Sequence, residues 1–197
     1  MGIAGLDNIG KTYGAYNYTN RVHNNSDKSF GATIGNVTEM PSPNLTLHMS
    51  KEGDAEKSVG SWGNPNAGRS ITLYQPQDYD SANPIYKMKV WDMDDNLLEE
   101  RTIDINSIDP NNADSYEMYA LSVYGEKSGK CPDAVARFTM MHAKQEAEQR
   151  AQTGSYSLDI QEKWLDILNN FMKEQLDMGF MDGYLKNKAY LDFLTDK

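Results

Sequence analysis

The clearest pattern in the chain is an alternation of apolar and polar residues over two neighbouring segments, Ile85–Trp91 and Leu98–Ile105. Alternation with a period of two is typical of half-buried strands, and the polar run Asp94–Asn96 between them suits a turn. The two segments therefore predict an antiparallel hairpin. Two shorter and more mixed runs, Asn44–Met49 and Arg69–Tyr74, indicate further strands.

The run Gly60–Gly68, rich in Gly, Asn and Pro, predicts a loop in which Trp62 rests against the core. From Asp109 onward the period changes to that of a helix. Asp114 and Glu117 form a capping-box pattern, which predicts a helix that runs to about Tyr124.

Three further helices are expected after Pro132, and we expect them to supply most of the core. The first runs from Pro132 to about Gln152, where Gly154 ends it; the second is capped by Ser157 and ends at Gly179; the third spans about Asp182 to Leu194. The second carries the strongest apolar stripe, Trp164, Leu165, Leu168, Phe171, Met172 and Leu176. Such a stripe usually packs in the core, and the alternative is a protein-binding groove supported by the eleven methionines.

Residues 1–42 show neither period and are rich in Gly, Asn and Tyr. A segment of this composition cannot bury enough apolar surface to offset its ordering entropy, so we expect a flexible arm. Tyr13, Tyr16 and Tyr18 are its candidate contact residues, since tyrosine gives contact area at low entropic cost. The predicted fold class is α+β: residues 43–197 form one domain, β-rich over 43–106 and helical over 107–197, with a small antiparallel sheet against three to four helices.

The charge of the chain narrows the classes of partner. The 197 residues carry a formal net charge of −10, which disfavours direct binding to nucleic acid or to an anionic membrane and permits a basic protein partner. No run approaches the roughly 18 apolar residues of a membrane span. The first residues do not resemble a secretory signal, so a cytoplasmic location is expected, with export by a leaderless route as the alternative.

Acidic residues are concentrated in 92–117, where nine acids accompany the single base Arg101. No spacing among them selects a catalytic pair of carboxylates. An acidic face that docks a basic partner is the functional interpretation, and its candidate residues are Asp95, Glu99, Glu100 and Asp104.

Three motifs in the sequence bear on possible chemistry. Asp92, Asp94 and Asn96 resemble the start of a calcium loop, but the sixth and twelfth positions hold Leu97 and Ile103 instead of Gly and Glu. The glycine-rich run 125–131 is one residue too short for a phosphate loop. A nucleophilic pair of Cys131 with a histidine is conceivable, because Cys131 would lie near a helix start. No cofactor is expected.

One family resemblance accompanies these patterns. The segment from Asn83 to Leu121 contains a hairpin followed by Ile108-Asp109-Pro110 and then Glu117-Met118-Tyr119-Ala120-Leu121. It resembles uncharacterised proteins of low-GC Gram-positive bacteria, in which a hairpin leads into a similar strand-to-helix junction. The resemblance implies a bacterial origin and no particular activity.

The sequence therefore favours a non-enzymatic interaction or structural protein that binds another protein. An acidic inhibitor or nucleic-acid mimic of phage or mobile-element type, which would occupy a basic groove, is the first alternative. A protein exported without a leader and an enzyme of unrecognised type are the others.

Overall fold

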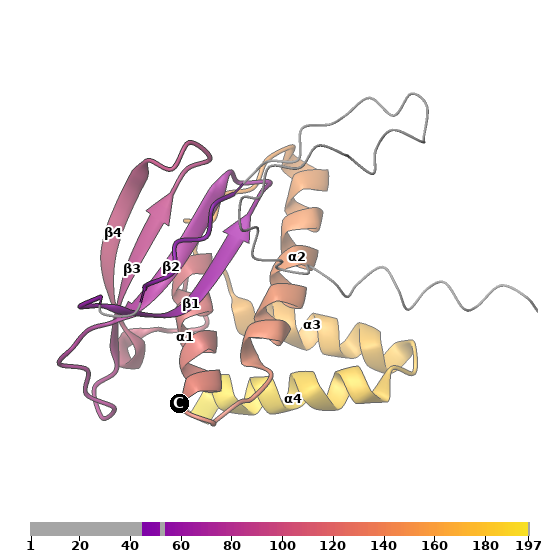
Figure 1. Ribbon diagram of the computed structural model, residues 1–197. Coiled ribbons are helices and arrows are strands. Elements are labelled where there is room, and N and C mark those ends of the chain that lie inside the picture. The colour runs from indigo at the N-terminus through magenta and orange to yellow at the C-terminus, as the bar shows by residue number, and fades with distance from the viewer. Residues whose placement is uncertain (1–44, 52–53, 197) are drawn as a thin grey trace, which may run out of the picture. The chain divides into compact units, whose positions relative to one another are not determined.

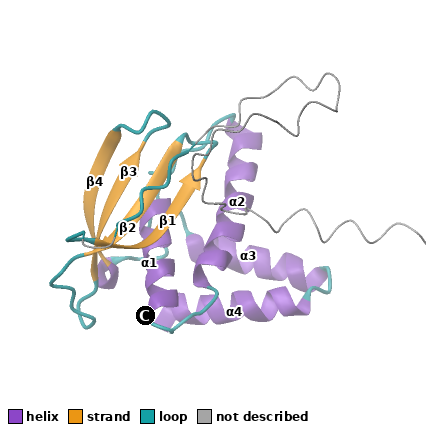
Figure 2. Cartoon of the chain, in the orientation of Figure 1, coloured by secondary structure: helices purple, strands orange, loops and turns teal. Residues whose placement is uncertain are grey.

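The computed structural model describes residues 45–51 and 54–196, which fall within one compact unit, Ser42–Lys197. Four strands form an antiparallel sheet in chain order: β1 (Lys57–Asn64), β2 (Arg69–Gln75), β3 (Ile85–Trp91) and β4 (Leu97–Asp104). Helices cover one face of this sheet (Figures 1 and 2). The α+β class is thereby confirmed, and the predicted arm 1–42 lies outside the described residues.

The predicted hairpin is present as β3 and β4. Met88 pairs with Arg101 and Tyr86 with Ile103, so these side chains share the face that meets the helices. The register then shifts, because Val90 opposes Glu99 while Trp91 opposes Leu97. Leu98 is the extra residue of a β-bulge, which bends the strand and redirects its neighbours.

Helix α1 (Ser115–Lys127) is the most buried element of the described chain. Its predicted capping box is confirmed: the Asp114 carboxylate accepts from the backbone N–H of Glu117, and the Glu117 side chain accepts from that of Asp114. Ten of its 13 residues are buried. The expectation that the helices after Pro132 supply most of the core is wrong. The sheet and α1 supply most of the buried apolar residues, because α1 lies between the sheet and those helices.

The remaining helices are α2 (Ala134–Thr153), α3 (Trp164–Asp177) and α4 (Met181–Asp196). Gly154 and Gly179 end α2 and α3 as predicted, with φ of 79° and 76°. Helix α4 packs closely on α1. A Cβ on Gly125 of α1 would lie 2.9 Å from the Phe193 ring of α4, and the Tyr190 hydroxyl lies 2.7 Å from Ser122 Oγ.

The predicted loop Gly60–Gly68 is a strand for half of its length, since β1 extends to Asn64 and only 65–68 form the turn. Gly60 and Gly63 lie in the strand and serve close packing, whereas Gly68, with a φ of 64°, belongs to the turn. A Cβ on Gly60 would lie 2.8 Å from Val123 Cγ2, so the missing side chain lets α1 approach β1. Trp62 is buried as expected, on the face toward the helices.

The predicted strand Asn44–Met49 is wrong for its described part, residues 45–49, which belong to no strand. This segment crosses the outer face of the sheet and is fixed by side chains instead of a backbone ladder. Thr72 Oγ1 donates to the His48 carbonyl at 2.7 Å, and the His48 ring stacks on Trp91 with 3.9 Å between centroids.

The start of the third helix also differs from prediction, because α3 begins at Trp164 and Ser157 caps no helix. The segment before it runs beside the junction that leads into α1. Ser115 N donates to Leu158 O at 3.0 Å, and Glu162 N donates to Ala113 O at 3.0 Å. These tertiary bonds fix residues 158–162 in a turn and a single β-bridge, where the local sequence favours a helix.

Candidate functional site

The β3–β4 turn, where the calcium-like residues lie, is closed by its own hydrogen bonds. Asp92 Oδ1 accepts from the backbone N–H groups of Asp94 and Asn96, each at 2.9 Å, and Asp92 Oδ2 accepts from Asn96 Nδ2 at 3.0 Å. The side-chain bond from Asn96 is the largest cause that lowers the pKa of Asp92. Asn96 thus points its amide nitrogen, a donor, at the carboxylate.

This geometry builds a turn and gathers no set of metal ligands. In residues 45–51 and 54–196, no group of three or more His, Cys, Asp or Glu side chains is placed to hold a metal ion. A calcium ion at Asp92, Asp94 and Asn96 would have to displace the bonds that shape the turn.

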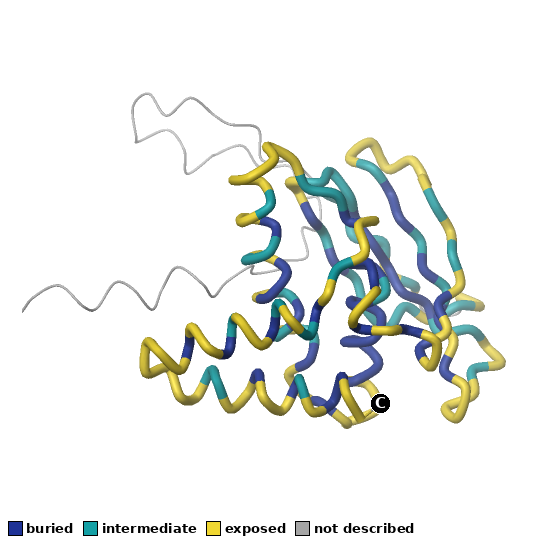
Figure 3. Tube along the Cα trace, turned by 180° about the vertical axis from the view of Figure 1, so that it is seen from behind, coloured by how far each residue is buried: buried dark blue, intermediate teal, exposed yellow. Residues whose placement is uncertain are grey.

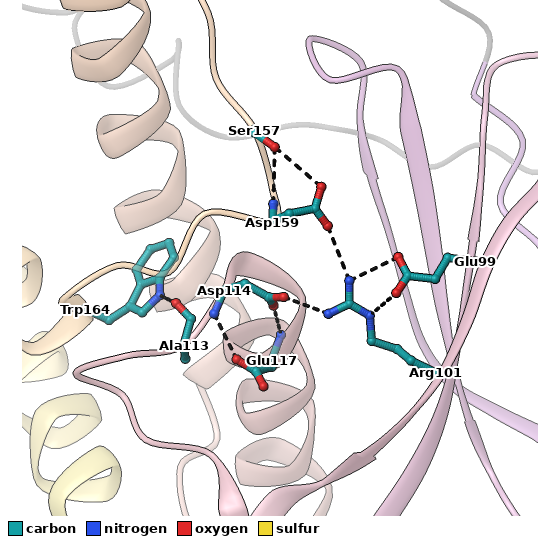
Figure 4. Close-up of polar contacts among 8 residues, drawn as sticks. All are labelled: Glu99, Arg101, Ala113, Asp114, Glu117, Ser157, Asp159 and Trp164. Atoms are coloured by element: carbon teal, nitrogen blue, oxygen red, sulfur yellow. Dashed lines mark hydrogen bonds and ion pairs between the residues drawn. The ribbon is translucent and has the colours of Figure 1, made fainter.

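Arg101 is the centre of the acidic segment (Figure 4). Its guanidinium donates to both oxygens of Glu99 at 2.6 and 3.0 Å, to Asp114 Oδ2 at 2.7 Å, and reaches Asp159 Oδ1 at 3.3 Å. It also lies 4.7 Å from the centroid of the Tyr116 ring. The bonds to Glu99 and Asp114 raise the pKa of Arg101 although burial opposes them. One cation therefore joins β4, the start of α1 and the segment before α3.

Glu100 points to the opposite face of β4. It lies 3.7 Å from both Lys87 and Lys89, and Glu56 pairs with the same two lysines. The hydrogen bond from Lys87 is the largest cause that lowers the pKa of Glu56. These four side chains form a balanced set on the outer face of the sheet.

The remaining interaction candidates are dispersed. Asp95 belongs to the β3–β4 turn and has a φ of 63°. Its Oδ1 lies 3.3 Å from His48 Nε2. Asp104 caps a short 3-10 helix, η3 (Ile105–Ser107), at the other end of β4. The structure therefore does not bring Asp95, Glu99, Glu100 and Asp104 onto one acidic face. Tyr13, Tyr16 and Tyr18 lie outside the described residues.

Large apolar side chains near the same turn are exposed, and pattern analysis missed them. Met93 is 48% exposed, Leu97 53% and Leu98 48%. Met93 lies over the β1–β2 turn, because a Cβ on Gly68 would be 3.3 Å from its sulfur. The only signal for them in the sequence was two adjacent leucines after a polar turn, which cannot both face a core from one strand.

We define the strand-turn surface as Met93, Asp94, Asp95, Leu97, Leu98 and Glu99. It has apolar and acidic groups side by side at the end of β4. Since β4 pairs with β3 alone, it is an edge of the sheet. Within the described chain no strand occupies its other side.

Cys131, considered with a histidine for nucleophilic chemistry, is buried, and so is His142, the histidine nearest to it in the sequence. Burial raises the pKa of the Cys131 thiol, whereas a reactive thiolate requires a lowered one. His142 lies in the third turn of α2, whereas Cys131 precedes that helix. It is packed among the rings of Trp62, Phe138, Tyr156 and Trp164, and burial lowers its pKa to about 4.

Comparison of the chain with protein-family models, curated proteins and solved structures finds no match. The resemblance over Asn83–Leu121 stays a prediction. Across 45–51 and 54–196, no helix has the length and apolar character needed to cross a membrane.

Proposed function

We propose that this chain is a non-enzymatic protein-binding domain whose strand-turn surface takes an extended, basic segment of a partner protein. The observation that carries the proposal is the exposure of Met93, Leu97 and Leu98 beside the exposed Asp94 and Asp95, at the start of an edge strand. An edge strand offers backbone groups for pairing, and neighbouring side chains then select the sequence that pairs.

The bulge at Leu98 supports this interpretation. Without the extra residue, strict alternation would direct every second side chain of β4 to the helices. With it, Leu97 and Leu98 are both about half exposed. Edge strands are commonly protected by charge, and the middle of β4 has Glu99, Glu100 and Arg101 in that role. The apolar pair at its start is left unprotected.

The acids of the surface favour a basic partner. Asp94 and Asp95 lie in the turn, and among the described residues neither forms an ion pair with a lysine or an arginine; the group beside Asp95 is His48. A nucleic-acid mimic would instead require a row of free carboxylates. Glu99, Glu100 and Asp114 are already bonded to Arg101, Lys87 or Lys89, so this alternative receives no support from the same geometry.

Site-specific photo-crosslinking tests the proposal. A photoreactive residue at Leu97 should capture a partner protein, and one at Met140, an exposed residue of α2, should not. Substitution of both Leu97 and Leu98 by Ser should weaken binding of that partner at least about tenfold. The same substitution should change the free energy of unfolding by less than about 0.5 kcal/mol.

A charge test adds specificity. Asp94→Lys should weaken binding and make it less sensitive to salt, because it removes the attraction to a basic segment. Equal capture from Leu97 and Met140, or full binding by the double serine variant, would contradict the proposal.

A further inference from the structure

The turn that joins α3 and α4 carries a second set of exposed apolar side chains, distant in sequence from the strand-turn surface. We define the hairpin-end surface as five residues that are each between 47% and 60% exposed: Leu176, Met178, Phe180, Met181 and Leu185. Figure 3 shows the ends of both helices exposed where they meet.

The backbone beneath this surface is well fixed. Phe180 N donates to Gln175 O at 2.8 Å and Gly179 N donates to Leu176 O at 3.0 Å, which closes the end of α3 around Gly179. Tyr184 N then donates to Phe180 O as α4 begins. The exposed side chains therefore stand on an ordered helical turn.

The polarity of this end is inverted. Between the two helices lie polar side chains: Gln175 is 7% exposed, Asn187 is fully buried, and Asn187 Nδ2 donates to Gln175 Oε1 at 2.8 Å. A Cβ on Gly183 would lie 2.9 Å from the Gln175 amide, so the helices meet closely there. Apolar residues are outside and polar ones inside, the reverse of a helical hairpin that ends in water.

The charge around the surface is balanced. Residues 173–188 contain the cations Lys173, Lys186 and Lys188 and the anions Glu174, Asp177 and Asp182, so their formal charges cancel in a chain of −10. Lys186 pairs with Asp182 at 2.9 Å, and Glu174 with Lys144 at 3.1 Å. A strongly basic partner gains little here, and a second copy of this acidic chain meets no local repulsion.

The size of the surface fits a protein interface. Half of the accessible area of a large apolar side chain is on the order of 100 Å², so five such residues expose about 500 Å². A standard interface buries about 800 Å² on each partner, of which roughly 60% is apolar. The hairpin-end surface thus supplies the apolar part of one standard interface.

We propose that a second copy of this chain covers the hairpin-end surface, with α3 and α4 of one copy packed against α3 and α4 of the other. Two-fold symmetry places the same five residues on both sides, as in most homodimers. The four helix ends then share one apolar centre, in the manner of a helical bundle.

Sedimentation equilibrium over a range of concentrations from about 1 to 300 μM tests this proposal. The wild-type chain should be a dimer in the upper part of that range, and the Phe180→Ser, Leu185→Ser double variant should be a monomer throughout. The matched control, Met140→Ser with Ile160→Ser, removes apolar residues of 40% and 45% exposure elsewhere and should remain a dimer. Far-ultraviolet circular dichroism should show the same helix content for all three proteins.

A wild-type chain that is monomeric at every concentration overturns the proposal, even if another protein proves to bind at Phe180. A dimer that persists in the double variant overturns it as well. The double serine variant at Leu97 and Leu98 should still dimerise, so the result is independent of the function proposed for the strand-turn surface.

Discussion

At the scale of single residues, Gly60 decides how closely the sheet and α1 can pack. Its Cα faces Val123 and the Tyr119 hydroxyl, and a Cβ there would lie 2.8 and 2.9 Å from them. We expect Gly60→Ala to lower the free energy of unfolding by about 1–3 kcal/mol, as overpacking does in other cores. Urea denaturation measures this loss.

Two comparisons separate packing from chain entropy. Val123→Ala in the same chain should restore part of the stability that Gly60→Ala removes. Gly63→Ala should cost less, because the nearest atom to its Cβ would be the end of the Leu45 side chain, at 3.3 Å, and the next would be Leu47 Cδ2 at 3.7 Å. Equal losses at Gly60 and Gly63 would contradict the role assigned to Gly60.

His142 should make stability depend on pH. It is 2% exposed, its Nε2 has no hydrogen-bond partner among the described residues, and burial lowers its pKa to about 4 although Glu146 opposes the shift. An unfolded chain binds the proton at about pH 6.5, so acid favours unfolding. The stability that the buried, neutral His142 contributes is complete above about pH 6.5. As the pH falls to 4, the free energy of unfolding decreases by about 3 kcal/mol.

Unfolding free energies measured at pH 7, 6, 5 and 4 check this prediction. His142→Leu should lose less stability than the wild type over that interval, because it removes the group that binds the proton. His48→Gln is the matched control, since His48 lies on the outer face of the sheet beside Asp95. Parallel curves for the wild type and His142→Leu would refute the prediction.

At the scale of secondary-structure elements, Arg101 is the residue that joins them. Arg101→Lys keeps the charge but cannot bond Glu99 through both oxygens and also reach Asp114. We expect a loss of about 1–3 kcal/mol in unfolding free energy, measured by thermal or urea denaturation. Asp159→Asn should change it by less than about 0.5 kcal/mol, because its side chain is 63% exposed.

The elements that could be predicted are those whose signals are local. The alternation in β3 and β4, the capping box at Asp114 and the glycines after α2 and α3 each act within a few residues. The elements predicted wrongly depend on distant contacts. Gly60 looks like a loop residue until α1 is present, and Gly63 until Leu45 is present. The segment at Ser157 looks like a helix start until Ala113 and Ser115 bind it.

At the scale of the whole molecule, the acidic segment shows why the site was harder to predict than the fold. Its acids were correctly seen as concentrated, but a sequence does not reveal which carboxylates are paired. Arg101 alone occupies Glu99 and Asp114, which are 2 and 13 residues away. The exposure of Leu185 and Leu176 could not be predicted either, because both lie in helical patterns that resemble core patterns.

The entrance to α1, residues 110–115, is bonded to residues 158–164, which come much later in the chain. Ser115 N, Ala113 O and Pro110 O, at the entrance to α1, find their partners in Leu158, Glu162 and Trp164. Trp164 Nε1 also donates to Ala113 O at 2.8 Å. A chain that stops at Thr153 leaves these groups unpaired, and each costs about 1–3 kcal/mol when buried. We expect ribosome-bound chains ending at Thr153 to be digested rapidly by protease and the full chain to be resistant.

These bonds bear on the order in which the protein is made. The sheet and α1 leave the ribosome first, yet the stretch that completes the entrance to α1 is synthesised some forty residues later. The entrance to α1 therefore cannot complete its hydrogen bonds until the segment before α3 has been synthesised. The cell therefore holds a complete sheet beside an α1 whose entrance is unpaired, for the time needed to translate α2.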